Sequence, residues 1–437
     1  MAGNIQLLIC FFLLTFSLKS CTKPGNDDNY APEVMQSDPA DGAVNIPTDQ
    51  VITVQFTEKI VLLSGGRITL NDLPVEATTD ARSVVIRPSL KPDTEYTLII
   101  HEKTISDVAG NYAGAVTLRF TTKALQGVAG LDTVLATPQA SAQAVALFRY
   151  LRMNYGTRVL SGTMANHSTN IDEAIWVNQQ TGKWPKIVGF DFIDHPWPDQ
   201  NWVKYSAPFT LGKAYHDNGG IVTLMWHWRD PLTKSGAFYT ANTGFNVARV
   251  SDPASDEYKA MMVDIDIIAG YLREFRDAGI PILWRPLHEA SGKWFWWGAR
   301  GPEACKTLWK LMFDRLVNHH QLDNLIWVWT SDEKADAPDW YPGHDYVDII
   351  GMDIYPGENQ HGSQYAKFNA VTTMLGRRKM LALTECGSVP DPALMKQQGD
   401  MWAWFMTWNG DFTRSDRHNG AEWWKKLMGS ELVVSRD

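Results

Sequence analysis

The sequence has few cysteines and no excess of basic residues. Four cysteines in 437 residues are too few for the disulfide framework of a small secreted scaffold. The formal net charge of −9 gives no basic surface of the kind that binds nucleic acid. No His-Glu-x-x-His motif or acidic calcium loop occurs, so we expect neither a metal nor another cofactor.

Tryptophan, in contrast, is abundant. The chain has 19 Trp, most of them after residue 170, while its 44% hydrophobic and 20% charged residues are ordinary for a globular protein. Indole rings stack on the flat C–H faces of sugars, which favours a carbohydrate ligand. They also fill large cores, and both interpretations stay open for individual residues.

The N-terminus has the pattern of an export signal. Residues 7–16 form an apolar run that is too short to span a membrane and typical of a signal peptide. The following Leu18-Lys-Ser-Cys21 resembles a bacterial lipobox, so we expect residues 1–20 to be removed and Cys21 to be lipidated. An ordinary cleaved secretion signal is the alternative. Residues 21–31 are polar and predict a flexible tether.

Residues 32–123 are expected to form an all-β domain. Five short runs rich in β-branched residues are separated by turn residues, which is typical of a β-sandwich: Val51–Phe56, Arg67–Leu70, Ser83–Arg87, Tyr96–Ile100 and Val116–Thr121. The motif Asp107-Val-Ala-Gly-Asn111 resembles a bacterial immunoglobulin-like domain. Few aromatic residues occur here, so we expect a spacer rather than a sugar-binding module. Residues 124–139 predict a linker.

Residues 140–437 alternate between strand and helix patterns. Eight strands are predicted, at Arg158–Thr163, Lys186–Asp191, Ile221–Trp226, Ile282–Leu287, Leu325–Thr330, Val347–Asp353, Met380–Thr384 and Trp402–Thr407. Eight strands with mostly helical connections indicate a (β/α)8 barrel, so the chain is expected to be an α/β protein with a small sandwich in front. An open doubly wound sheet is the alternative, but no glycine-rich phosphate turn follows a strand.

Polar and aromatic side chains gather where these strands end. They are His227, Arg285, His288, Glu289, Asp353, Tyr355, Glu385 and Trp408. In a parallel barrel the catalytic side chains lie at the carboxyl ends of the strands. Glu289 and Glu385 are therefore a candidate acid and nucleophile.

Four spaced motifs together resemble glycoside hydrolase family 26, most members of which are endo-β-1,4-mannanases. The motifs are Trp226-His227, Trp284–Glu289 with Trp294–Gly298, Tyr341–Tyr355, and Ala382–Gly387. The resemblance implies that Glu289 is the general acid/base and Glu385 the nucleophile. It also implies that Tyr355 orients Glu385, that His227 and His288 bind the sugar at subsite −1, and that Trp408 stacks beneath it. Trp297 would be a wall near the scissile bond, and Trp226 would also contact substrate.

A retaining glycosidase needs its two carboxyl groups about 5–5.5 Å apart, with a raised pKa on the acid and an ionised nucleophile. Arg285 precedes Glu289 by four residues, on the same expected strand face. It either keeps a carboxylate ionised or forms a structural ion pair. We expect Asp353 to be structural or to accept a sugar hydrogen bond. A nucleophilic role for Cys386 is disfavoured, because strand alternation turns it away from Glu385.

Several properties stay open at this point. Asp191 and Asp194 are candidate ligands for a distal sugar, and alternation cannot place both Trp294 and Trp296 in a cleft. The expected partner is β-mannan, with mixed-linkage β-glucan or β-1,3-xylan as alternatives, and the loops at residues 192–201 and 229–249 decide between endo and exo action. A non-catalytic glycan-binding lipoprotein is the competing class. We expect a monomer, anchored by lipid on the outer-membrane surface of a Gram-negative bacterium.

Overall fold

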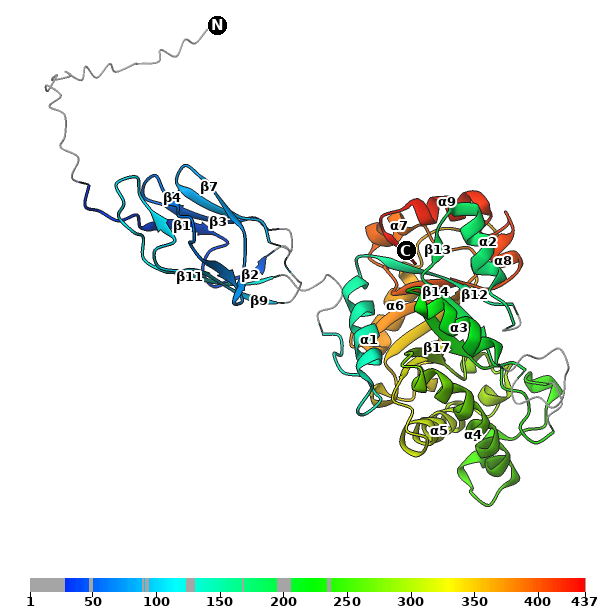
Figure 1. The fold of residues 1–437 in the computed structure, drawn as a ribbon. Helices are drawn as coiled ribbons and strands as arrows, with labels where there is room; N and C mark the ends of the chain where they lie inside the picture. The colour runs from blue at the N-terminus through cyan, green and yellow to red at the C-terminus, as the bar shows by residue number, and fades with distance from the viewer. Residues whose placement is uncertain are drawn as a thin grey trace, which may run out of the picture. The chain divides into compact units, whose positions relative to one another are not determined.

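The structure is a computed structural model that describes residues 28–46, 50–88, 90, 94–122, 130–166, 169–194, 206–233 and 237–436. The predicted signal peptide, Cys21, and parts of the tether, the linker and both cleft loops lie outside these residues. The chain divides into two compact units, residues 1–123 and 124–437 (Figure 1). Among the described residues, no helix is long and apolar enough to cross a membrane.

The first unit is a β-sandwich. One sheet has the order β1-β3-β8-β7, a second has the order β2-β11-β9-β5-β6, and β4 pairs with β10. The strands are β1 (Val34–Asp38), β2 (Ala43–Ile46), β3 (Ile52–Phe56), β4 (Val61–Leu62), β5 (Ile68–Leu70), β6 (Leu73–Pro74), β7 (Ala77–Asp80), β8 (Ser83–Ile86), β9 (Glu95–Ile100), β10 (Ile105–Ser106) and β11 (Val116–Thr122). The five strands expected from sequence are present, and those that were missed are short or mostly exposed.

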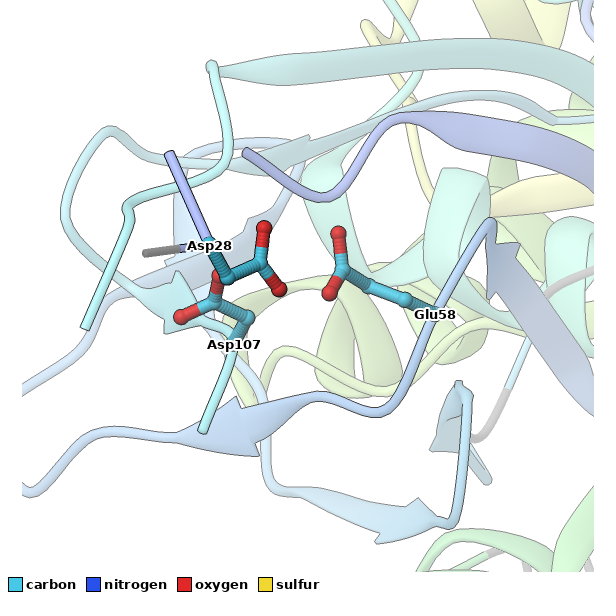
Figure 2. A group of neighbouring side chains, drawn as sticks. All are labelled: Asp28, Glu58 and Asp107. Atoms are coloured by element: carbon cyan, nitrogen blue, oxygen red, sulfur yellow. The ribbon is translucent and has the colours of Figure 1, made fainter. Parts of the chain in front are cut away.

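Three carboxylates of this unit lie close together (Figure 2): Asp28, Glu58 and Asp107. Asp107 already has local partners, because its Oδ1 accepts the backbone N–H groups of Gly110 (2.6 Å) and Asn111 (2.8 Å). The Asn111 side chain in turn donates to the carbonyl of Asp28 at 2.8 Å. The Asp-Val-Ala-Gly-Asn motif thus stabilises a turn and ties it to the start of the domain.

The second unit is a closed barrel of eight parallel strands, which confirms the predicted fold. In order around the barrel they are β12 (Val159–Met164), β14 (Ile187–Asp191), β15 (Ile221–Met225), β16 (Ile282–Arg285), β17 (Leu325–Ser331), β18 (Ile349–Ile354), β19 (Met380–Cys386) and β20 (Trp404–Thr407). β20 pairs with β12 and closes the barrel. The fourth strand ends at Arg285, two residues earlier than expected.

Helices cover the barrel (Figure 1). They are α1 (Ala142–Asn154), α2 (Asp172–Thr181), α3 (Ala207–Asp217), α4 (Asp256–Asp277), α5 (Pro302–Phe313), α6 (Tyr365–Leu375), α7 (Pro392–Gln398), α8 (Asp411–Arg414) and α9 (Ala421–Gly429). The expected helix over residues 302–319 changes to a π-helical turn at Asp314–His319. Short 3-10 turns occupy Thr240–Asn242, Val247–Ser251, Ala290–Gly292, Trp296–Gly298, Ala337–Trp340 and His344–Tyr346.

The strands are buried on both faces, as expected for a parallel barrel. Side chains such as Leu283 and Ile326 belong to an inner cluster that also includes Phe148 of α1, whereas Trp284 and Trp327 pack in the outer layer. The chain returns to its first barrel strand near its end, because β21 (Val433–Arg436) pairs with β12 and with the short β13 (Trp184–Pro185). This packing holds the strand ends, and hence the side chains on them, in fixed positions.

Candidate active site

The carboxyl ends of β16, β18 and β19 bring three acidic residues together. Glu289, Asp353 and Glu385 each place one carboxylate oxygen within 4.8 Å of the others. Glu385 lies within β19, whereas Glu289 follows β16 by four residues. Strands β17 and β18 lie between β16 and β19, so the two glutamates meet across the mouth of the barrel.

Glu385 is buried and both of its carboxylate oxygens are engaged. Arg285 donates from Nη2 to Oε1 at 2.5 Å, and the Tyr355 hydroxyl donates to Oε2 at 2.5 Å. Hydrogen bonds from a guanidinium to a carboxylate are shorter and stronger than those between neutral groups. Arg285 therefore pairs with Glu385. It does not share a strand face with Glu289, because β16 ends at Arg285 and Glu289 lies in the turn beyond.

Glu289 has a different environment. Among the residues that the structure describes, its side chain has one hydrogen-bond partner, the indole N–H of Trp294, which donates to Oε2 at 3.0 Å. Burial and then the nearby charge of Glu385 raise the pKa of Glu289 to about 7. The two glutamates thus lie within reach of one another in different environments, with Glu385 paired to Arg285 and Glu289 keeping part of its proton near neutral pH.

Asp353 contacts Arg285, the same residue that contacts Glu385. Its side chain is fully buried, accepts from Arg285 Nη1 at 3.1 Å and accepts from the Thr384 hydroxyl at 2.7 Å. Burial and the charge of Glu385 raise its pKa well above the ordinary value. By distance alone the three carboxylates could surround a cation, but the Arg285 guanidinium already contacts two of them. The donor set fits acid/base chemistry better than metal binding.

Two histidines follow the neighbouring strands β15 and β16. Nδ1 of His227 is 2.5 Å from Oδ2 of Asp191, and the His227 backbone N–H donates to Oδ1 at 2.9 Å. Burial lowers the pKa of His227, but the Asp191 carboxylate overcomes this and raises it. His288 lies 4.5 Å away between ring centroids, and burial followed by the charges of His227 and Arg285 lowers its pKa well below the ordinary value.

The aspartates proposed for a distal sugar have structural partners instead. Asp191 is buried and both of its oxygens contact His227, as described above. Asp194 accepts a hydrogen bond from Arg229 at 3.2 Å and is also buried. Sequence position near a strand end did not reveal these pairings, because the partners come from the next strand and its loop. Asp191 thus orients a histidine.

The tryptophans near the site differ in their exposure to solvent. Trp226 and Trp297 were expected to contact substrate, but both are almost completely buried. Trp226 stacks on Trp228 at 4.0 Å, and the Trp297 indole donates to the carbonyl of His288 at 2.8 Å. Trp294 is instead 37% exposed beside Glu289. Strand alternation could not identify it, because the segment forms 3-10 turns.

Trp408 is partly exposed after β20, and its ring lies 6.0 Å from that of His227. A cavity of about 370 Å³ opens beside Glu289; it is lined by Glu289, Trp294, Asp332, Glu333, Lys334, Asp353 and Tyr355. Cys386 donates from Sγ to the carbonyl of Met406, and its burial raises the thiol pKa, so it does not act as a nucleophile here. Asp332 was not identified from the sequence.

Comparisons with known proteins agree with this geometry. A mannan endo-1,4-β-mannosidase of Thermothelomyces thermophilus is 38% identical over 316 residues, which cover 70% of this chain and 63% of that protein. One of Piromyces sp. is 35% identical, covering 70% and 50%. The chain therefore spans between half and two thirds of the length of these relatives.

Solved structures give the same result. A β-mannanase from a symbiotic protist of the termite Reticulitermes speratus, complexed with gluco-manno-oligosaccharide, has a TM-score of 0.66 at 38% identity, covering 70% of this chain and 98% of that one. A family 26 domain of an endo-β-mannanase/endo-β-glucanase from Prevotella bryantii scores 0.62 at 35% identity, with coverage of 70% and 99%.

Family comparisons cover both units. Residues 28–122 match a bacterial Ig-like domain, and residues 136–437 match glycosyl hydrolase family 26. The second match includes the whole barrel and every residue of the acidic site. The resemblance inferred from four motifs is thereby confirmed, and the chain belongs to glycosyl hydrolase family 26.

Proposed function

We propose that the protein is an endo-β-1,4-mannanase that acts with retention of configuration. The observation that supports this most directly is the pair of glutamate carboxyl groups, with oxygens within 4.8 Å and opposite environments. Retaining enzymes hold these groups about 5–5.5 Å apart, whereas inverting enzymes leave roughly 6.5–9.5 Å for a water molecule. The relatives named above are β-mannanases, which supports mannan as the substrate.

In the first step Glu385 attacks the anomeric carbon and forms a glycosyl ester. Glu289 gives its proton to the departing glycosidic oxygen, so the C–O bond breaks as the new one forms. The raised pKa of Glu289 supplies a protonated acid near neutral pH. In the second step the now ionised Glu289 takes a proton from water, which attacks the anomeric carbon and breaks its bond to the Glu385 carboxylate.

The remaining side chains of the site hold the sugar in position. We assign subsite −1 to the region bounded by Glu385, Tyr355, His227, His288 and Trp408. His227 is fixed by Asp191, so its free ring nitrogen Nε2 can donate to a hydroxyl of the sugar. Trp408 offers a partly exposed indole face for stacking. Trp294, next to Glu289, would contact the departing part of the chain.

Product analysis tests the proposal. Wild type and Glu385→Ala are incubated with galactomannan, unbranched mannan and mixed-linkage glucan, and the anomeric form of the first product is followed by NMR. We expect a range of short β-configured manno-oligosaccharides from wild type and none from the variant. A single small product would indicate exo action. Cleavage of the glucan alone would reassign the substrate, and no cleavage of any would favour glycan binding without catalysis.

We also propose that the protein is lipid-anchored through Cys21 at the cell envelope, on the outer-membrane surface. The apolar run and the lipobox-like sequence before Cys21 support this, as does the acidic pair Asp27-Asp28 after it. Expression in a Gram-negative host with labelled palmitate should label wild type but not Cys21→Ala. Protease treatment of intact cells then reports on surface exposure. Unlabelled wild type would argue for an ordinary secretion signal.

A further inference from the structure

The backbone around Glu289 is left-handed at three residues that are not glycine. Their φ angles are 51° at Leu287, 52° at Glu289 and 62° at Lys293. Such conformations are uncommon and persist only where the surroundings impose them. Backbone hydrogen bonds do part of this: Glu289 donates to the carbonyl of Thr330 at 3.2 Å, and Gly292 donates to that of Glu289 at 3.0 Å.

A buried side chain adds a second restraint. Asp332 directly follows β17, the strand next to β16, and only 4% of it is exposed. Its Oδ1 accepts hydrogen bonds from the Ser291 hydroxyl and from the backbone N–H of Lys334, the latter at 3.0 Å. Ser291 is the middle residue of the 3-10 turn Ala290–Gly292, which begins immediately after Glu289. The bond therefore joins the turn after Glu289 to the end of the neighbouring strand.

The second oxygen of Asp332 has an unusual position. Oδ2 is buried and has no hydrogen-bond partner among the described residues, and Asp332 lines the same cavity as Glu289. Leaving a buried acceptor unpaired is costly, so such groups in folded proteins call for an explanation. Burial raises the pKa of Asp332, while its bond to Ser291 lowers it. The charge of Asp332 in turn adds to the effects of burial and of Glu385 that raise the pKa of Glu289.

We propose that Asp332 is a positioning residue for Glu289, acting through Ser291 to fix the turn that carries the acid/base. This inference rests on the proposed function, because it assumes that Glu289 protonates the leaving oxygen. A carboxylate at this position does two things that a neutral side chain does not. It accepts a strong hydrogen bond from Ser291, and it places a negative charge beside a carboxyl group that must keep its proton.

Ser291→Ala tests the restraint, and Ser331→Ala is the matched control. The Ser331 hydroxyl is also buried beside Asp332. It donates to the backbone carbonyl of Asp332 at 2.8 Å and not to the Asp332 carboxylate. With manno-oligosaccharides, whose leaving group needs a proton, we expect kcat/KM of Ser291→Ala to fall about tenfold. With a dinitrophenyl mannobioside, whose dinitrophenolate group leaves without a proton, kcat/KM should stay within about twofold of wild type. The control should match wild type on both substrates.

Asp332→Asn tests the charge while keeping the shape and one acceptor oxygen. Removing a negative neighbour lowers the pKa of Glu289, so the alkaline limb of kcat/KM should move to lower pH. The positioning role would be contradicted if Ser291→Ala lost the same factor of kcat/KM on both substrates. It would also be contradicted if Asp332→Asn left the alkaline limb of kcat/KM at its wild-type pH. Inactive wild type on every β-glycan would instead refute the proposed function. Circular dichroism shows whether Ser291→Ala and Asp332→Asn are folded. If one of them is not, the result of the other decides whether Asp332 positions Glu289.

Discussion

The Tyr355 hydroxyl donates to Oε2 of Glu385, the carboxylate oxygen that Arg285 leaves free. A hydrogen bond to a charged group contributes about 1.5–3 kcal/mol. We expect Tyr355→Phe to lower kcat about 10- to 100-fold, because the carboxylate loses its orientation for attack on the sugar. KM should change little. Steady-state kinetics on mannotetraose give the result, and a loss confined to KM would mean that Tyr355 only binds substrate.

Activity should depend on pH through Glu289. The carboxyl group must be protonated to release the leaving group, and its pKa is raised to about 7, so kcat/KM should fall as pH rises through about 7. With a dinitrophenyl mannobioside, whose leaving group needs no proton, we expect this limb to be absent from the kcat/KM profiles of both wild type and Glu289→Ala. Retention of the limb in that variant would assign it to another group.

The same residue should reduce stability at high pH. Its pKa is raised in the folded protein, so the folded state binds the proton more tightly and loses stability as pH rises from about 4.5 through about 7. Glu289→Gln removes the buried charge, and we expect its free energy of unfolding at pH 8 to exceed that of wild type by about 1–2 kcal/mol. Urea unfolding at pH 5 should give a smaller difference. An equal gain at both pH values would point to packing.

Replacing Trp294 should mainly lower activity, whereas replacing Trp297 should mainly lower stability. Trp294→Ala removes an exposed indole that donates to Glu289, so we expect weaker activity, an alkaline limb at higher pH, and little change in stability. Trp297→Ala empties a fully buried site and should cost about 3–5 kcal/mol. Kinetics and thermal unfolding of both variants separate the two effects. Comparable stability losses would show that Trp294 is also structural.

Asp191 and His227 form a buried ion pair, and breaking this pair should lower the free energy of unfolding. Asp191→Asn is expected to destabilise the protein by about 3–5 kcal/mol at pH 6. The pKa of His227 is raised, so the stability from its proton is full below the unfolded value near 6.5 and is lost as pH rises through the folded value. The variant should therefore lose less at pH 9. Equal losses at pH 6 and pH 9 would indicate an uncharged hydrogen bond.

The strands were predictable, whereas the conformation of the turns that follow them was not. All eight barrel strands follow from apolar runs, because a strand buried on both faces leaves a continuous hydrophobic signal. The positions of Glu289 and Glu385 follow from the ends of those runs. The exposure of Trp294 and the burial of Trp297 could not be predicted, because the segment after Glu289 has 3-10 turns and left-handed residues, where alternation no longer applies.

Pairings between distant segments were also beyond the sequence. Asp191 contacts a histidine 36 residues away, and Arg285 contacts Glu385 across 100 residues. Spacing along one strand suggested a relation between Arg285 and Glu289, but the barrel turned the guanidinium toward β18 and β19. Such partners depend on which strands adjoin and on where each one stops, and neither is encoded in local periodicity.

The closure of the barrel has a consequence for how the protein is made. Leu160 of β12 pairs with Trp404 of β20, and Val159 pairs with Val433 of β21. On the ribosome, β12 therefore emerges long before β20 and β21 are synthesised. Until then one edge of β12 and its apolar side chains stay uncovered. Contacts of such long sequence separation slow folding and leave intermediates prone to aggregation. Slower translation late in the chain would lengthen that exposure, so yield in a heterologous host should depend on chaperones that shield nascent chains.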